Sequence, residues 1–292
     1  MSTSNAQAAS KAYAAFIPEK WSLKVRENLH KSNVMLKCVN RDYEGEIKDS
    51  GDTVKIRSYG NVAVFTYDGS IDDNQYLTPT PTVQELLIDQ ATAWAIKVPD
   101  IEKAQADIDV LSGHTEEASI SLDEAVDTFL LAKHADVPAG NTIGTVSVPI
   151  ALTKDNIYEN MVKLSTKLKK ANAIGKGRKK PFVVINPDIE ALVRLSPEFI
   201  HATTLGDNVL REDSIGKIAG LDVMVSTNFE AVSGKYYIMA GTNDAISFAE
   251  QLIKTESLKV SGFFGDLVRG LMVYGAKTVQ PNALAKIIAT VA

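Results

Sequence analysis

The sequence predicts an α+β protein with an extended first half and a compact second half that begins near residue 150. Three observations lead to this prediction. Residues 53–67 alternate apolar and polar side chains, which is typical of a β-ribbon. Residues 101–129 carry apolar side chains every three or four positions, which indicates a long amphipathic helix. Beyond residue 150, short apolar strands follow helices and turns, as in a layered globular domain.

The ribbon is expected to be a two-stranded hairpin. Its strands are Thr53–Arg57 and Val62–Tyr67, joined by a tight turn around Gly60-Asn61. An isolated two-stranded ribbon is only marginally stable in water, so we expect this segment to need a partner. From Leu86 to Val98, one alternate set of side chains predicts a single long strand, ~40 Å at ~3.3 Å per residue, that returns the chain from the hairpin.

Two helices are expected in the first half of the chain. A short, highly charged helix near the N-terminus places Trp21, Val25 and Leu29 on one apolar stripe that nothing nearby in the sequence covers. A longer helix is predicted over residues 100–135, ~50 Å at 1.5 Å per residue if it is continuous. Gly113 marks the place where a bend or break is expected, because glycine costs ~1 kcal/mol relative to alanine in a helix.

The second half follows a linker at 136–149 that is rich in Pro, Gly and Thr. Its pattern predicts a helix capped by Thr153, a short buried strand at Pro181–Pro187 and a helix capped by Asp188. The last segment, Asn282–Val291, fits either a helix or a strand. Further strands are expected at Lys217–Ser226, Lys235–Ala240, Ala245–Ala249, Ser257–Ser261 and Leu267–Val279.

The composition is that of an ordinary globular protein, with 45% hydrophobic and 23% charged residues. The formal net charge of −5 argues against a dedicated nucleic-acid-binding protein, whose surface would be basic. The single cysteine, Cys38, closes no internal disulfide and is expected as a small buried hydrophobic residue. No run approaches the ~18 apolar residues of a membrane span, and the N-terminus lacks the charged region of a signal peptide. We therefore expect a cytoplasmic protein.

No catalytic site, cofactor or metal is predicted. Gly175–Lys180 is rich in glycine and lysine, but it lacks the spacing of a P-loop and precedes a strand, so a solvated turn is expected. The acidic loop Asp68–Asn74 lacks the glycine position and the terminal glutamate of a calcium loop, which leaves a weak divalent contact as the alternative to a solvated loop. The histidines lie apart and are expected at the surface rather than as general bases: His30, His114, His134 and His201.

The predicted hairpin and the N-terminal helix, which nothing nearby covers, indicate contacts with other copies of the same chain. Apolar faces without cover mark interaction surfaces, and unpaired strand edges invite pairing between chains. The candidate inter-subunit contact residues are Trp21, Val25, Leu29, Val54, Ile56, Tyr59, Val62, Val64 and Phe65.

Four segments between about Phe16 and Leu284 carry a family resemblance: FIPEKWSLKVRENLHKSNVM, VNRDYEGEIKDSGDTVKIRSYG, PFVVINPDIEALV and LVRGLMVYGAKTVQPNAL. In this order they resemble the major capsid proteins of tailed bacteriophages, which share the Hong Kong 97-type fold. The resemblance implies five parts of the chain: an N-terminal arm at 1–40, an extended loop with its tip near Gly60 and a return strand at 41–98, a peripheral domain with a spine helix at 99–151, an axial domain at 152–251, and a return to the peripheral domain with the C-terminal segment at 252–292.

The resemblance also implies a function, a major capsid protein that self-assembles into an icosahedral shell around a double-stranded DNA genome. The implied partners are further copies of the chain in hexamers and pentamers, a separate scaffolding protein, a portal, and DNA packaged without sequence-specific binding; no membrane is involved. Assembly would take place in the cytoplasm of a bacterial host. The alternatives are an encapsulin-like cellular compartment, another virion component such as a tail tube and, from a different class, a cytosolic α+β enzyme.

Overall fold

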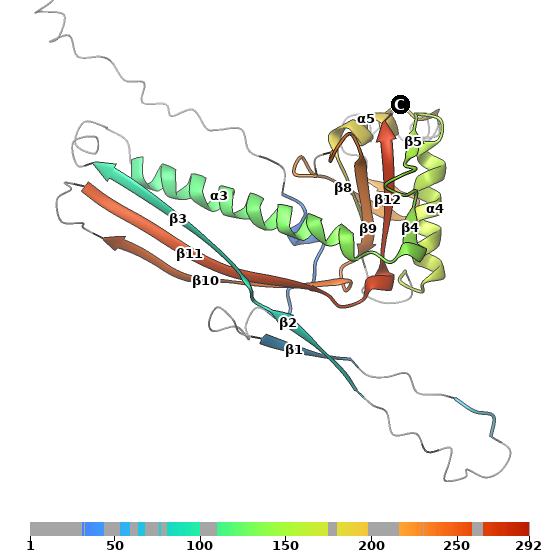
Figure 1. Ribbon diagram of the computed structural model, residues 1–292, viewed down its shortest axis with the longest axis horizontal. Helices are drawn as coiled ribbons and strands as arrows, with labels where there is room; N and C mark the ends of the chain where they lie inside the picture. The colour runs from blue at the N-terminus through green and yellow to red at the C-terminus, as the bar shows by residue number, and fades with distance from the viewer. Residues whose placement is uncertain are drawn as a thin grey trace, which may run out of the picture.

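The computed structural model describes residues 31, 33–43, 53–58, 64–67, 76, 81–99, 110–174, 180–197, 216–229, 231–258 and 265–291. Within these ranges the chain has the α+β structure that the sequence predicts. It consists of an elongated part, in which a long helix lies beside a three-stranded sheet, and a compact part built on a seven-stranded sheet (Figure 1). A two-stranded arm projects from the region between them.

The elongated part is an antiparallel sheet with the strand order β10-β11-β3. Helix α3 runs along this sheet (Figure 1) and contacts it through Phe129, whose ring meets that of Tyr274 edge-on at 5.3 Å. Trp94 lies over Gly270, where a Cβ atom would come within 2.4 Å of the indole Nε1, so this close approach requires glycine. The elements are β3 (Gln90–Pro99), α3 (Val110–Leu131), β10 (Ile246–Leu258) and β11 (Gly265–Thr278).

Three expectations for the elongated part need correction. Strand β10 is continuous, whereas two strands separated by a gap were expected; a register shift between Leu252 and Lys254 keeps it paired with β11 through its polar middle. The predicted strand Leu86–Val98 is interrupted at Ile88 and Asp89, because the chain passes there from the arm to the three-stranded sheet. Helix α3 passes through Gly113 without a break.

The arm does not have the predicted hairpin. Strand β1 (Thr53–Ser58) pairs antiparallel with β2 (Thr82–Leu87), and not with Val62–Tyr67. Residues 64–67 are described and form no strand. The expected turn at Gly60-Asn61 lies outside the described residues. Local alternation had indicated two strands, but the long-range pairing places Val54 opposite Leu86 and buries both side chains.

The compact part is a sheet with the strand order β4-β12-β9-β6-β8-β7, in which β5 also pairs with β12. For Asn282–Val291 the sequence allowed either a helix or a strand, and the structure has a strand there, β12 (Leu284–Val291). It is parallel to β4 and β5 and antiparallel to β9. Helix α4 covers the outer face of this sheet (Figure 1). The elements are β4 (Thr142–Ile143), β5 (Ile150–Leu152), α4 (Ile157–Lys170), β6 (Pro181–Ile185), α5 (Pro187–Arg194), β7 (Lys217–Ile218), β8 (Leu221–Val225), β9 (Tyr236–Thr242) and β12 (Leu284–Val291).

Local capping differs from the sequence prediction at both helices. Helix α4 begins after Asn156, three residues beyond the predicted cap Thr153, whose carbonyl accepts a hydrogen bond from the Ile157 N–H. Helix α5 is capped by Asn186, which accepts a hydrogen bond from the Ile189 N–H at 3.2 Å. Short 3₁₀ helices complete the described chain: η1 (Met35–Lys37), η4 (Ala132–Asp136), η5 (Ala139–Asn141) and η6 (Pro281–Ala283).

The segment predicted as one strand from Lys217 to Ser226 is a hairpin. Its two strands, β7 and β8, are joined by Ala219 and Gly220, which both have positive φ angles, 51° and 83°. Two consecutive residues in the left-handed region make a turn whose twist matches that of antiparallel strands. The bounds of the axial domain, 152–251, stay a prediction. The seven-stranded sheet extends past these bounds, because it also contains β4 and β5, which begin before residue 152, and β12, which follows residue 251.

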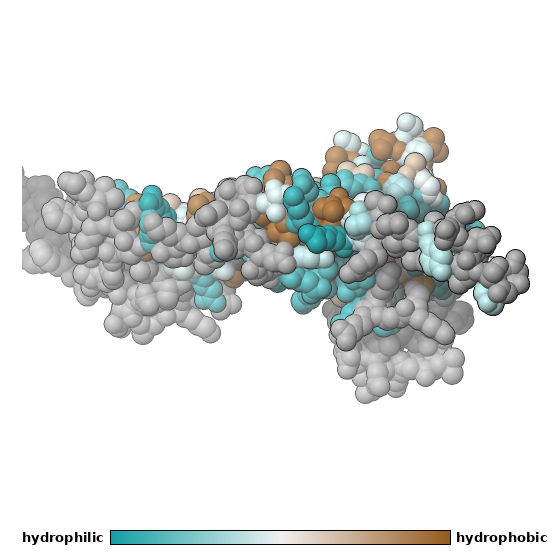
Figure 2. All heavy atoms as spheres, turned by 90° about the horizontal axis from the view of Figure 1, so that it is seen from below, coloured by the Kyte–Doolittle hydropathy of each residue, from teal (hydrophilic) through white to brown (hydrophobic). Residues whose placement is uncertain are grey.

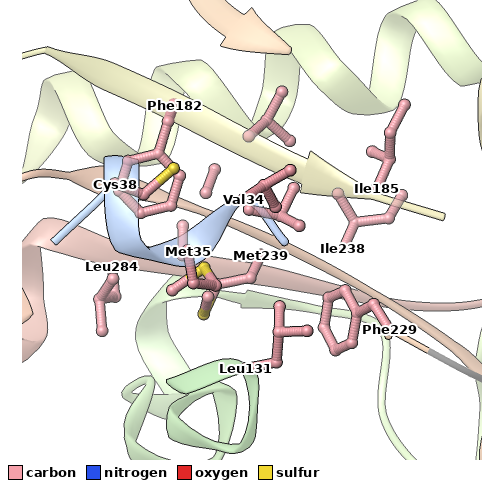
Figure 3. Close-up of a cluster of buried hydrophobic side chains, with 14 of the residues drawn as sticks. Val34, Met35, Cys38, Leu131, Phe182, Ile185, Phe229, Ile238, Met239 and Leu284 are labelled. Atoms are coloured by element: carbon pink, nitrogen blue, oxygen red, sulfur yellow. The ribbon is translucent and has the colours of Figure 1, made fainter. Parts of the chain in front are cut away.

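The N-terminal segment 33–40 is part of the hydrophobic core of the compact part. Val34, Met35 and Cys38 point into a cluster that includes Phe182 and Met239 from the sheet (Figure 3). Cys38 is 3% exposed, so its expected burial is confirmed, and burial raises the pKa of its thiol to about 12. The thiol is therefore neutral in the core.

Candidate inter-subunit surface

The arm is fastened to the rest of the chain by a small hydrophobic core of its own. Val54 and Ile56 of β1, each 3% exposed, pack with Leu86 and Ile88. Ala249 of β10 and Val273 of β11 close this core from the three-stranded sheet. The expectation that the ribbon lacks cover within its own chain is therefore wrong at Val54 and Ile56, which present no free surface to a neighbour.

The crossing of the arm over strand β11 depends on Gly275. A Cβ atom at this residue would lie 2.2 Å from the carbonyl oxygen of Leu87 and 3.0 Å from the Cα of Ile88. Contacts this short with backbone atoms cannot be relieved by a side-chain rotation. A hydrogen bond from the Gln84 side chain to the carbonyl of Val279, at 3.1 Å, adds a second attachment.

The outer surface of the arm and its loop is apolar at several exposed positions. Val64 is 97% exposed and Phe65 is 44% exposed, so these two predicted contact residues are free to meet a neighbour. Tyr59, Val62 and the stripe of Trp21, Val25 and Leu29 lie outside the described residues. Sequence reasoning did not single out four further exposed hydrophobic residues: Tyr67, Tyr76, Val83 and Leu87.

The signal for two of these was present in the alternation of strand β2. Val83 and Leu87 lie on the face opposite Leu86, beside the cross-strand pair of Lys55 and Glu85. Viewed from below, hydrophobic and hydrophilic side chains lie interspersed over the described surface (Figure 2). A mixed surface of this kind is typical of contacts between subunits that fold separately and then associate.

A buried carboxylate, which the sequence reasoning missed, joins three segments of the chain. Asp127 of α3 is 0% exposed. Its Oδ1 accepts hydrogen bonds from the backbone N–H groups of Val34 and Met35, at 2.9 and 2.8 Å. Its Oδ2 accepts from Ser226 Oγ at 3.2 Å and from Asn228 Nδ2 at 2.9 Å.

Asp127 thereby ties α3 to the N-terminal segment and to the connection after β8. It satisfies N–H groups at the start of η1 that have no partner within that short helix. Further along the same segment, Asn40 exchanges backbone hydrogen bonds with Ile246 and Phe248 of β10, at 2.9 and 2.8 Å. The segment therefore links the elongated and compact parts.

His134 departs from the expectation that the histidines lie at the surface. It is half-buried in η4, with its ring 4.4 Å from that of Tyr237 and 5.8 Å from that of Phe229. Burial lowers its pKa to about 4, and the positive charge of Lys286 acts in the same direction. His114 is exposed, as expected, whereas His30 and His201 lie outside the described residues.

The described residues also bear on metal sites and membrane spans. Nowhere in the described ranges do three His, Cys, Asp or Glu side chains gather where they could hold a metal ion. No helix in the same ranges is both long and apolar enough to cross a membrane. Two segments considered above lie outside these ranges. They are residues 175–179 of the glycine- and lysine-rich turn and the acidic loop Asp68–Asn74.

No protein-family model matches the chain, and no curated protein matches its sequence. Solved structures do match the structure of the chain. A structure from Mycobacterium phage Che8 has 25% sequence identity and a TM-score of 0.73, covering 93% of this chain and 96% of that one. The capsid of Ralstonia phage GP4, 11% identical, has a TM-score of 0.72, and the match covers 94% of this chain and 96% of that one. The capsid of cyanophage P-SCSP1u, 14% identical, has a TM-score of 0.69 and covers 95% and 94%.

The likeness extends over more than nine tenths of each chain. It confirms the fold expected from the four sequence segments. The chain has the Hong Kong 97-type fold of the major capsid proteins of tailed bacteriophages.

Proposed function

We propose that the protein is a major capsid protein that self-assembles into an icosahedral shell around a double-stranded DNA genome. The observation that carries this proposal is the match to chains of phage capsid structures over more than nine tenths of both chains. The role is structural, and no catalytic step is assigned to any residue. The shell forms in the cytoplasm of a bacterial host, with a separate scaffolding protein and a portal as further partners.

The exposed surface of the arm supports this proposal. A subunit alone leaves Val64, Phe65 and Tyr67 in water, which is unfavourable at ~25 cal/mol per Å² of apolar surface. A neighbouring copy that covers them would recover this free energy. Within the proposal, Tyr59, Val62 and the stripe of Trp21, Val25 and Leu29 serve the same purpose, because their sequence pattern is also apolar.

In the same proposal, the five parts of the chain have separate tasks. Residues 1–40 form the arm at the N-terminus, and 41–98 reach over a neighbour and return. Residues 99–151 and 252–292 form the peripheral domain and the C-terminal segment, and 152–251 form the axial domain, which meets its copies around the five- and six-fold axes.

Expression of the protein, with and without the scaffolding protein encoded beside its gene, tests the proposal. Electron microscopy should reveal closed particles of uniform size, and particles recovered from infected cells should protect DNA from nuclease. Subunits that stay monomeric in every assembly condition would contradict it. Particles that enclose a cellular enzyme and no DNA would instead identify an encapsulin-like compartment.

A further inference from the structure

Two helices on different sides of the subunit carry opposite charge. Helix α3 contains five acidic residues and no Lys or Arg, whereas helix α4 contains four lysines and one glutamate. The basic character continues beyond α4: residues 163–180 hold eight of the 31 Lys and Arg of the chain and none of its 36 Asp and Glu. Such separation is notable in a chain whose formal net charge is −5.

Three of the four lysines of α4 line an open groove of about 980 Å³. Its walls are one side of α4 and the segment from Gly140 to Ile143, and its lining includes Lys163, Lys167 and Lys170. Lys167 is held in place because its Nζ donates to the carbonyl of Gly140 at 2.6 Å. Lys163 pairs with Glu159 at 2.7 Å, while Lys170 makes no ion pair with any described residue.

The groove also offers apolar surface. Val162, on the wall of the groove, is 40% exposed, and Tyr158 one turn before it is equally exposed. The opposite side of α4 is buried against the sheet through Ile157, Met161, Leu164 and Leu168. The lysine face therefore looks outward, away from the sheet and from α3 (Figure 1).

Three of the five acidic residues of α3, Glu116, Asp123 and Asp127, share one flank of that helix. Glu116 and Asp123 are exposed and lie seven residues apart, two turns along the same side, with the half-buried Ile120 between them. Asp127, one turn further, belongs to the same flank and binds Ser226 and Asn228 of the compact part. At Asp127 this flank therefore reaches the compact part, which begins at the C-terminal end of α3 (Figure 1).

We propose that the lysine face of α4 in one subunit binds the acidic flank of α3 in the next subunit of a capsomer ring. This inference rests on the proposed function, because a closed ring needs two different, complementary surfaces on each copy. Lys163 and Lys170 have the same two-turn spacing, ~10 Å, as Glu116 and Asp123. Val162, which lies next to Lys163, and Ile120 supply an apolar contact beside the charged residues.

A charge-reversal exchange tests this contact. The variant K163E/K170E changes the groove, E116K/D123K changes the flank, and a third protein combines all four substitutions. The control, K154E/K169E, makes the same change of charge with two exposed lysines outside the groove lining. Each protein is assembled in the same way as the wild type, with the scaffolding protein if it is needed. Rings and shells are counted by native mass spectrometry and electron microscopy.

Each two-site variant should lower the yield of rings by roughly tenfold or more, because like charges then oppose each other across the interface. The combined protein should recover most of the yield, and the control should match the wild type. Thermal unfolding of the unassembled subunits shows whether a variant has lost its fold. If the flank variant has lost its fold, the exchange is repeated with one substitution on each surface, E116K on the flank and K170E in the groove.

Three results would overturn the inference while leaving the proposed function intact, provided that the wild type forms shells. The first is a flank variant that assembles normally. The second is a folded combined protein that assembles no better than the two-site variants. The third is a groove variant that forms normal shells but retains less DNA or scaffolding protein, which would mean that the groove binds a polyanion or an acidic peptide. If the wild type itself forms no shell, the proposed function fails instead.

Discussion

Single residues hold the segments of this subunit together, and Asp127 is the clearest case. Its carboxylate joins α3, the N-terminal segment and the connection after β8 through four hydrogen bonds. Two of its donors are backbone N–H groups of Val34 and Met35, which are buried. A buried donor that loses its acceptor keeps its full desolvation cost.

Replacement of Asp127 by alanine should therefore lower the free energy of unfolding by roughly 3 kcal/mol or more. Chemical denaturation of the unassembled subunit measures this. The matched control is Asp123→Ala on the same helix, where the carboxyl is exposed and should matter by less than about 1 kcal/mol. Equal effects at both positions would contradict the assigned role of Asp127.

His134 makes stability depend on pH in a defined direction. Its pKa is lowered from 6.5 to about 4 in the folded chain. Between these values the unfolded state binds a proton that the folded state does not, so the free energy of unfolding falls as the pH drops from about 6.5 to about 4. The variant His134→Phe should show a weaker loss over this window, whereas the exposed His114→Phe should keep the full loss. Denaturation curves at several pH values distinguish the two.

Two glycines give a paired prediction about backbone packing. Gly275→Ala should destabilise by roughly 1–3 kcal/mol, since the added Cβ meets the backbone of Leu87. Gly113→Ala, in the exposed part of α3 with nothing within 4 Å, should stabilise by about 1 kcal/mol. Thermal unfolding of both variants checks the signs, and a stabilising Gly275→Ala would show that the crossing of the arm has room to adjust.

At the scale of elements, the arm is a separate unit with a minimal core. Strands β1 and β2 pair only with each other within the described chain, and two strands are too few to be stable alone. Their stability depends on Val54 and Ile56, which pack against residues of β10 and β11. The arm can therefore detach locally while the two larger sheets stay folded.

Ile56→Ala should release the arm without unfolding the subunit. Loss of a buried isoleucine side chain costs about 2–5 kcal/mol, which should appear as faster amide hydrogen exchange in β1 and β2 and unchanged exchange in β6 and β9. Val64→Ala, at an exposed position of the same segment, should leave all four strands unaffected. Faster exchange throughout the seven-stranded sheet of the Ile56→Ala variant would mean that the arm and the compact part unfold together.

At the scale of the whole molecule, exposed apolar residues should affect assembly more than folding. Replacing Val64 and Phe65 together by serine removes apolar surface that the subunit alone leaves in water. The free energy of unfolding should stay within about 0.5 kcal/mol of the wild-type value, while the yield of closed particles falls. A normal yield would exclude these two residues from the contacts between subunits.

The sequence by itself determined the features that depend on neighbouring residues. The repeat of three and four residues defines α3, the apolar run of Pro181–Ile185 defines β6, and four short segments identify the capsid fold. The apolar residues Val34, Met35 and Leu36 just before Cys38 were enough to predict its burial. In each case a few consecutive residues contain the whole signal.

Only the tertiary structure decided which surfaces are left free. Alternation in β1 indicates two faces, but its partner, β2, lies beyond the expected hairpin strand, and the residues that cover Val54 and Ile56 are Ala249 and Val273, about 200 positions away. The half-buried state of His134 likewise depends on Phe229 and Tyr237, from the other half of the chain. Burial is a property of all the segments that meet at a point, whereas periodicity describes only one of them.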